Sequence, residues 1–232
     1  MADLRRLIRR TVRRAGFQRT IAPTFVDVMR HHDVDVVLDV GANDGDYGRE
    51  IRDAGYTGRI VSFEPASATF ARLQAATAAD PLWTAVQLGV GEEAGQLELS
   101  NSVMDVYSSF KAPSAVGGEA SGIHAVSTET VDVVRLDDWL AQHPHYLSRT
   151  YLKIDTQGFE GEVLRGAGAT LDRFVAVQGE LGLTTLYEGQ EDWLTIANWM
   201  RGRGFEVATM VCNSADRQRA TATEYDIVFT RR

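Results

Sequence analysis

The stretch from Val36 to Tyr47, VVLDVGANDGDY, constrains the fold of this chain more than any other part of the sequence. It begins as an apolar, β-branched run, reaches an acid, and then passes through closely spaced glycines before an amphipathic segment. This order is typical of a strand, a tight turn and a helix. At the carboxyl edge of a parallel sheet, such a turn presents backbone N–H groups and a helix N-terminus to a ligand. The rest of the chain is expected to complete a ligand site around this turn.

Strand and helix patterns alternate through most of the chain, with connections of a few residues. Strands are predicted at 35–40, 58–64, 83–90, 150–155 and 174–181, and helices at 24–31, 46–54, 67–79, 137–142, 160–165 and 191–203. This alternation indicates a parallel sheet wound by right-handed crossovers. Two final strands, 205–211 and 225–230, are joined by a polar loop without helical periodicity, which favours a hairpin. The expected fold is α/β and Rossmann-like, with a mostly parallel seven-stranded sheet whose last strand is antiparallel.

The segment 100–130 interrupts this alternation. It lies between predicted strands at 96–100 and 130–136, is rich in Ser, Gly and Ala, and has little periodicity. Long connections of this kind are commonly lids or binding loops. We therefore expect a substrate-facing lid here, carrying Ser108, Ser109, Lys111 and His124.

The net charge of −8 hides an asymmetry between the N-terminus and the remainder. Residues 1–19 carry a charge of +6 and the remainder −14, and an acidic body argues against a nucleic-acid-binding surface. We expect residues 1–31 to form a helical arm, with a basic amphipathic helix at 3–15, before a catalytic domain at 32–232. That helix either packs, solvated, on the domain edge, or rests on a membrane surface or closes over an anionic substrate.

The sole cysteine, Cys212, cannot form an intramolecular disulfide and fits a reducing compartment. The sequence has no apolar run long enough to span a bilayer, and its N-terminus lacks the apolar core of a signal peptide. The expected location is therefore the cytoplasm. The oligomeric state is left open, with a dimer plausible.

Three acids stand at or just after the ends of the first three predicted strands: Asp39, Glu64 and Glu92. In an open parallel sheet the ligand lies beyond these ends, so the three acids are expected to line one crevice. Glu64 follows Asp39 by about the distance at which an acid accepts hydrogen bonds from the hydroxyls of an adenosine ribose. This spacing indicates a nucleoside ligand.

The glycine spacing narrows the choice of nucleoside. GANDGDYG lacks the G-x-G-x-x-G pattern of a dinucleotide site and the Gly-Lys-Ser/Thr ending of a P-loop. Asp39, Asp44 and Asp46 would repel a pyrophosphate but attract the ammonium group of an amino acid. An adenosine joined to an amino acid without phosphate is S-adenosylmethionine. Two alternatives stay open: a non-catalytic nucleoside-binding scaffold and, less favoured by the acidic loop, a nicotinamide-dependent oxidoreductase.

A second group of candidate residues is Lys153, Asp155, Glu160 and Glu180. Only two of the 24 basic residues are lysines, which suggests a chemical reason for Lys153, because a lysine pKa can be lowered and that of arginine cannot. Lys153 either contacts a hydroxyl of an acceptor molecule that reacts with S-adenosylmethionine, or forms a structural ion pair with Asp155 and Glu160. Asp155 and Glu180 are expected at adjacent strand ends, as general base or jointly as ligands of a divalent cation. His124 is the competing base.

Several motifs in this order resemble the FkbM family of S-adenosylmethionine-dependent methyltransferases: VVLDVGANDGDY, SFEP, GVGEEAG, VVRLDDWL and LKIDTQGFEGEVLRGA. The resemblance covers roughly residues 35–180 and implies methyl transfer to a hydroxyl of a sugar or polyketide-type natural product. It also implies that Asp39, Gly41, Asn43 and Gly45 hold the methionine end, Glu64 the ribose diol and Glu92 the adenine amino group. Neighbouring positions in the same motifs complete the expected lining: Ala42, Asp44, Tyr47 and Pro65 for the cofactor, and Gln157 and Glu160 for the acceptor. Ser108 and Ser109 of the predicted lid, which lies outside the resemblance, are also expected to face the acceptor.

Overall fold

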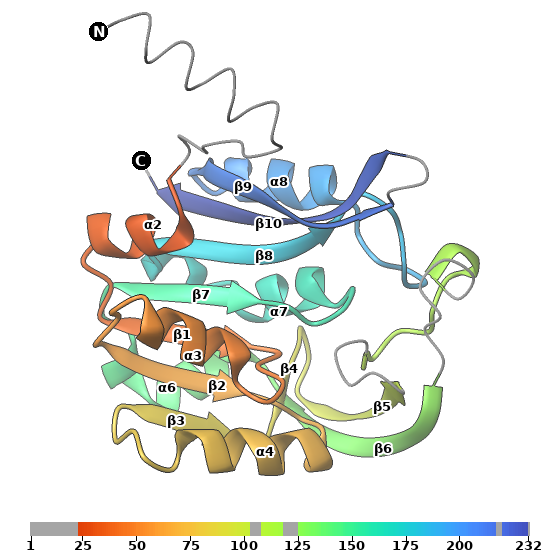
Figure 1. The fold of residues 1–232 in the computed structure, drawn as a ribbon, viewed down its shortest axis with the longest axis horizontal. Helices are drawn as coiled ribbons and strands as arrows, with labels where there is room; N and C mark the ends of the chain where they lie inside the picture. Colours follow the sequence, from red (N-terminus) through yellow and green to blue (C-terminus); the bar gives the residue numbers. More distant parts are fainter. Residues whose placement is uncertain (1–22, 103–107, 118–124, 217–219, 232) are drawn as a thin grey trace, which may run out of the picture.

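The computed structural model describes residues 23–102, 108–117, 125–216 and 220–231. Its main sheet has seven strands in the order β3-β2-β1-β7-β8-β10-β9 (Figure 1). The strands are β1 (Val36–Val40), β2 (Arg59–Phe63), β3 (Trp83–Val86), β7 (Thr150–Ile154), β8 (Ala176–Gly182), β9 (Phe205–Asp216) and β10 (Thr221–Arg231). Strands β3, β2, β1, β7 and β8 are parallel to one another, and β10 is antiparallel to both β8 and β9.

This topology confirms the predicted Rossmann-like fold and its antiparallel last strand. The strand order reverses between β1 and β7, because β1 leads outward to β2 and β3 while β7 leads to β8 on the other side. A ligand of an open α/β sheet binds in the crevice at such a reversal, beyond the carboxyl ends of the strands. The turn after β1 therefore stands at the position where a ligand is expected.

Helices cover both faces of the sheet (Figure 1). They are α2 (Phe25–His31), α3 (Asp46–Asp53), α4 (Ser67–Thr77), α6 (Leu136–Gln142), α7 (Glu160–Gly166) and α8 (Trp193–Gly202), with short 3₁₀ turns at Pro144–Tyr146 and Leu171–Arg173. One core cluster joins the sheet to α2, α3 and α4, and a larger cluster joins the opposite face to α6, α7 and α8. Two buried faces explain why the central strands read as continuous apolar runs.

Helix α2 packs as part of the domain, although the sequence assigned it to an N-terminal arm. Thr24 caps it, with the Thr24 side chain accepting from the Asp27 backbone N–H and the Asp27 side chain accepting in return. Val28 and Met29 are buried in the same cluster as Tyr151. Residues 1–22, including the predicted helix 3–15, lie outside the described residues. No helix in the described ranges is long and apolar enough to cross a membrane.

The predicted strand 83–90 is wrong as a single element. The chain leaves the main sheet after Val86 and resumes as β4 (Gly89–Val90), which belongs to a separate three-stranded sheet of order β4-β6-β5. In that sheet β5 (Gly95–Ser102) pairs with β6 (Ala125–Val134) in a long antiparallel ladder. The predicted thirty-residue loop is therefore shorter, because both strands extend into the range 100–130.

Candidate functional site

The turn after β1 needs glycine at position 41 for a steric reason. Gly41 has φ +76°, and a Cβ on it would collide with the backbone carbonyl of Asp155 after β7. Strands β1 and β7 thus approach too closely at their carboxyl ends for any side chain here. Gly45, with φ +94°, is the N-cap residue of α3 and directs the chain into that helix. The glycines shape the turn, and Gly41 brings its backbone against the β7 end.

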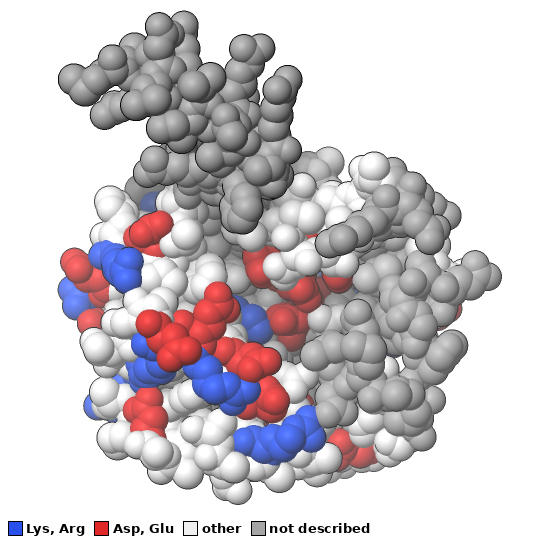
Figure 2. All heavy atoms as spheres, in the orientation of Figure 1, with Lys and Arg blue, Asp and Glu red and all other residues white. Residues whose placement is uncertain are grey.

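A cavity of about 540 Å³ lies beyond the carboxyl ends of β1, β2 and β7. Figure 2, which views the molecule from the α2 and α3 side of the sheet, shows acidic side chains gathered around a hollow near the centre. Seven of the predicted cofactor residues line the cavity: Gly41, Ala42, Asn43, Asp44, Tyr47, Glu64 and Pro65. Pockets for nucleoside-sized ligands commonly occupy roughly 300–1,000 Å³, so the cavity has room for one.

Glu64 is held at the end of β2 by the turn itself. Its Oε2 accepts from the Asn43 N–H at 3.0 Å and its Oε1 from the Ala66 N–H at 2.9 Å. Burial raises the pKa of Glu64 to about 7, although these two hydrogen bonds act to lower it. Each carboxylate oxygen keeps a second lone pair, so the side chain can accept from both hydroxyls of a vicinal diol.

Asp39 does not reach the cavity, contrary to the prediction for the methionine end. It is completely buried within the sheet, where its Oδ2 accepts from Ser62 Oγ at 3.0 Å and Ser62 Oγ in turn accepts from Trp83 Nε1 at 3.0 Å. Lys153 Nζ lies 3.4 Å from Asp39 Oδ1. The carboxylate is thus used inside the protein, where it holds Lys153 rather than a ligand. Gly45 also lies outside the lining.

Glu92 is likewise absent from the cavity lining. The sequence placed it at the end of a main-sheet strand, but the chain has already crossed into the small sheet at β4. Its side chain is half exposed and its Oε2 accepts from Arg165 Nε at 2.6 Å. Three residues that come shortly before it, Leu88, Gly89 and Val90, line the cavity instead.

Asp155 and Glu180 do face the cavity together, as predicted. Gln157, with φ +55°, joins them: its Nε2 donates to Asp155 Oδ1 and to Glu180 Oε2, both at 2.8 Å. Burial and then the charge of Asp155 raise the pKa of Glu180 well above its ordinary value. Burial would also raise the pKa of Asp155, but the charge of Lys153 and several hydrogen bonds outweigh it and lower that pKa. The two pKa values shift in opposite directions, so near neutral pH the pair shares a proton instead of losing both.

Lys153 lines the cavity as a charged ammonium, not as a lysine with a lowered pKa. Burial alone would lower its pKa, but Asp155, Asp39 and Glu180 outweigh burial and raise it. Its Nζ lies 3.3 Å from Asp155 Oδ2 and 5.3 Å from the centre of the Tyr47 ring. The prediction of a chemical reason based on a lowered pKa is wrong. Lys153 instead fixes the two carboxylates of β1 and β7.

Glu160 takes the structural role that the sequence left open, although its partner is a turn and not Lys153. It is buried, and its Oε1 accepts from Thr156 N at 3.0 Å, Thr156 Oγ1 at 3.1 Å and Gly158 N at 3.1 Å. Burial raises the pKa of Glu160 to about 7. It is absent from the cavity lining, so the predicted acceptor contact is not supported.

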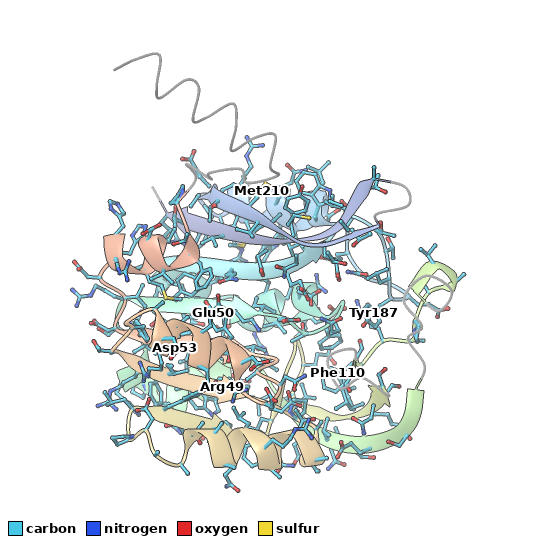
Figure 3. All side chains as sticks on the ribbon, viewed as in Figure 1. Arg49, Glu50, Asp53, Phe110, Tyr187 and Met210 are labelled. Atoms are coloured by element: carbon cyan, nitrogen blue, oxygen red, sulfur yellow. The ribbon has the colours of Figure 1, made fainter. Side chains whose placement is uncertain are left out.

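Ser108 and Ser109 line the cavity from the 100–130 segment. Ser109 Oγ donates to the Gln157 carbonyl oxygen at 2.7 Å, which ties this segment to the turn after β7. Phe110 and Tyr187 lie beyond the carboxyl end of β7 (Figure 3). The Tyr187 hydroxyl donates to Gln157 Oε1 at 3.0 Å and so orients the amide. The predicted base His124 lies outside the described residues.

Several lining residues were missed by the sequence reasoning, namely Leu88, Phe110, Asn213, Ser214 and Glu224. Asn213 is the most telling, because its Nδ2 donates to Glu180 Oε1 at 2.8 Å. Asn213 lies in the polar segment between the last two predicted strands, and the sequence of this segment does not indicate which residues would pair across the strands or face the cavity. In the ranges that the structure describes, no group of three or more His, Cys, Asp or Glu residues is placed to hold a metal ion.

Comparison with known proteins decides the family. Residues 39–207 match the family described as Methyltransferase FkbM domain. The chain belongs to the FkbM methyltransferase family. This FkbM domain contains both the turn after β1 and the Asp155–Glu180 pair within the matched range.

Two relatives and one solved structure are similar to this FkbM domain. The 2-O-methyltransferase NoeI of Sinorhizobium fredii is 25% identical over 162 residues, which cover 67% of this chain and 66% of NoeI. Methyltransferase 1 of Beauveria bassiana is 27% identical over 198 residues, covering 78% of this chain and 76% of the relative. The crystal structure of methyltransferase FkbM from Methylobacillus flagellatus KT superposes with a TM-score of 0.55 at 17% identity, covering 84% of this chain and 44% of that chain. This last likeness shows a shared fold, and the chain spans under half of that protein.

Proposed function

We propose that this FkbM domain transfers a methyl group from S-adenosylmethionine to a hydroxyl of a small-molecule or glycan acceptor, such as a sugar or polyketide-type product. The observation that carries the proposal is the buried Glu64 carboxylate, fixed by the turn after β1 at the wall of the cavity. This carboxylate can accept hydrogen bonds from the two hydroxyls of a ribose, and the glycine turn beside it has no cation that would bind a phosphate. Among the described lining residues the sole cation is Lys153, which Asp39 and Asp155 already neutralise.

The residues present fit this donor. Glu64 would accept from the ribose hydroxyls, and the acidic side of the turn, Asp44 and Asp46, suits an ammonium group. Gly41 lets the turn lie directly against the carboxyl end of β7, so its backbone lines the cavity beside Asp155. When bound, S-adenosylmethionine supplies a methyl group activated by a positively charged sulfur.

Asp155 and Glu180 supply proton transfer in this proposal. In the free domain the pair shares a proton, so it must lose that proton before it can accept another. A cationic ligand beside the pair favours loss of that proton, because opposite charge stabilises the ionised carboxylates. The pair then accepts the hydroxyl proton as the acceptor oxygen bonds to the methyl carbon and the carbon–sulfur electron pair stays on sulfur. Gln157 keeps both carboxylates aligned throughout.

Transfer to oxygen is supported by one relative, whose name describes a 2-O-methyltransferase. At 25% identity this supports the reaction class and says nothing about which acceptor this chain uses. The apolar wall formed by Leu88, Leu99 and Phe110 suits the adenine ring and leaves the Asp155 side for the acceptor.

Two measurements test the proposal. Calorimetry with S-adenosylmethionine and S-adenosylhomocysteine should show binding of both, and absence of binding of either would refute the donor assignment. A screen of hydroxylated acceptors with a labelled methyl donor, run with and without EDTA, should give a labelled ether in at least one case. Labelled amines alone, with no labelled ether, would refute transfer to oxygen.

A further inference from the structure

A second cavity, of about 340 Å³, opens beside the first on the α2 and α3 side of the sheet. Its walls come from Phe25 of α2, Tyr47 and Glu50 of α3, and strands β7, β8, β9 and β10. Glu50 lies on the side of α3 nearer to β7 (Figure 3). The two cavities share Tyr47, Lys153, Asp155 and Asn213, so a ligand in the second would reach Asp155.

One polar group in this cavity is buried without a partner. Thr209 of β9 is 5% exposed and lines the cavity, and its Oγ1 has no hydrogen-bond partner among the described residues. A buried hydroxyl without a hydrogen-bond partner is unfavourable, and a ligand that hydrogen-bonds to it would remove that cost. The unpaired hydroxyl points to a polar ligand.

The charge of the walls defines the ligand further. Glu50, Asp155 and Asp226 line the cavity against one cation, Lys153. Lys153 is already engaged by Asp155 and by Asp39 beneath it, so the cavity has an acidic excess. Burial and the charge of Asp155 raise the pKa of Asp226, although Gln178, Lys153 and Asn213 act to lower it. A cation beside the Glu50, Asp155 and Asp226 carboxylates would be attracted to all three.

Aromatic rings complete a site for an organic cation. The Phe25 and Tyr47 rings lie 5.7 Å apart, tilted by 38°, and both line the cavity. The faces of aromatic rings attract ammonium groups, and more strongly when water is excluded. An anionic ligand would lie beside the Glu50, Asp155 and Asp226 carboxylates and is disfavoured by their charge.

We propose that the second cavity binds a protonated amine of the acceptor, so that the acceptor is a small amino alcohol or amino sugar rather than an anionic or purely apolar compound. The inference rests on the proposed function, because Asp155, a proposed proton acceptor, lines both cavities. Glu50, Asp226 and the two rings hold the ammonium group, and Thr209 hydrogen-bonds to a polar group of the same ligand. The hydroxyl beside the amine then lies toward Asp155.

Three probes matched in size and differing in one group test the proposal: trans-2-aminocyclohexanol, trans-cyclohexane-1,2-diol and 2-hydroxycyclohexanecarboxylate. Glucosamine, glucose and glucuronate form a second matched set. Saturation-transfer NMR on the full chain with S-adenosylhomocysteine present should rank the amines first, by about tenfold in affinity over the neutral probes, and the carboxylates last. Equal affinity for the amine, neutral and carboxylate probes, or tightest binding of the carboxylates, would overturn the proposal.

A cavity-filling variant locates the binding. Val211 lines the cavity and is 45% exposed, so Val211→Trp should fill the cavity without unfolding the protein and abolish the amine signals. Met210→Trp is the matched control. Met210 is opposite Ile227 in the β9–β10 pair, so the two side chains lie on the same face of the sheet, and Ile227 is in the core on the α8 face. A tryptophan at position 210 would therefore lie on the side of the sheet away from the second cavity (Figure 3). Asp226→Asn should lower amine affinity about tenfold and leave the neutral probes unchanged. Amine signals that persist in Val211→Trp would refute the site.

Calorimetry with S-adenosylhomocysteine separates the two proposals. Retained cofactor binding without any amine preference refutes the amine site alone. If the native chain does not bind S-adenosylhomocysteine, the proposed function is refuted as well. Retained cofactor binding by Val211→Trp, together with loss of the amine signals, is the expected result.

Discussion

Replacing Lys153 by methionine should destabilise the fold strongly, because it leaves a buried carboxylate without its counter-charge. Lys153 Nζ lies 3.4 Å from Asp39 Oδ1 and 3.3 Å from Asp155 Oδ2, and the Lys153 and Asp39 side chains are 7% and 0% exposed. Methionine is about as long and apolar, so the main loss is the charge. Removing one partner of a buried ion pair costs about 3–5 kcal/mol, a large share of the roughly 5–15 kcal/mol that stabilises a domain.

The deficit should grow with pH. Burial already raises the pKa of Asp39 above its ordinary value in the native fold, against the opposing charge of Lys153 and the hydrogen bond from Ser62. Without Lys153 this pKa rises further, so Asp39 of the variant stays protonated when folded and ionises when unfolded. The folded state then binds more protons, and stability falls by up to about 1.4 kcal/mol per pH unit between the unfolded and folded pKa values.

Urea unfolding of the native chain and of Lys153→Met at pH 5 and pH 8 measures both effects. Lys111→Met is the control: Lys111 pairs with Glu162 at 2.9 Å, with side chains 12% and 20% exposed, so we expect a loss of about 1–2 kcal/mol there. The double variant Asp39→Asn/Lys153→Met should recover part of the loss. A Lys153→Met deficit below about 1 kcal/mol that does not change with pH would refute the reasoning.

Three further variants test the first cavity. Glu64→Gln should weaken S-adenosylhomocysteine binding by at least about tenfold in calorimetry, whereas Glu92→Gln should bind it as tightly as the native chain does. Because the pKa of Glu64 is about 7 and the ribose diol needs the ionised carboxylate, the affinity of the native chain for this ligand should fall as the pH drops below about 7. Equal loss in both variants would contradict the placement of Glu92. Gly41→Ala should lower the free energy of unfolding by more than about 2 kcal/mol, whereas Gly202→Ala, with nothing within 4 Å, should change it by less than about 1 kcal/mol. Glu180→Gln should keep cofactor binding and lose about 100-fold in turnover, and full activity would exclude Glu180 from proton transfer.

The main sheet could be predicted because its central strands are buried on both faces and separated by short helices with clear periodicity. The small sheet was predicted only in part, because strands at 96–100 and 130–136 were expected but β4 and the pairing of the three strands were not. Trp83–Val90 reads as one apolar run, and only the tertiary fold shows that the chain leaves the main sheet after Val86. That single error moved Glu92 from an exposed turn into the expected crevice. It also made β5 and β6 look like the ends of an unstructured loop.

The site was predicted in outline because strand ends converge whatever the details of packing. Asp155, Glu180 and Glu64 reach the cavity for that reason. The prediction placed Asp39 in the crevice because it lies near the end of β1. The sequence identifies this strand but does not show that the Asp39 carboxylate is buried inside the sheet, away from the cavity. Asp226 was missed because its place beside Glu180 depends on the antiparallel register of β10 against β8, which a polar sequence pattern does not reveal.

The two lysines of this arginine-rich chain share a geometry that explains why neither is arginine. Lys153 Nζ lies within 3.5 Å of oxygens from Asp39, Asp155 and Gly41, and Lys111 Nζ within 2.9 Å of oxygens from Glu162 and Gly189. A compact ammonium can approach several oxygens from different directions in little space, whereas a planar guanidinium needs a broad, flat site. The choice of lysine therefore reflects convergent carboxylate and carbonyl oxygens in a confined volume. Because Lys153 binds both a β1 and a β7 acid, the same ammonium that stabilises the sheet also sets the charge of the two cavities it separates.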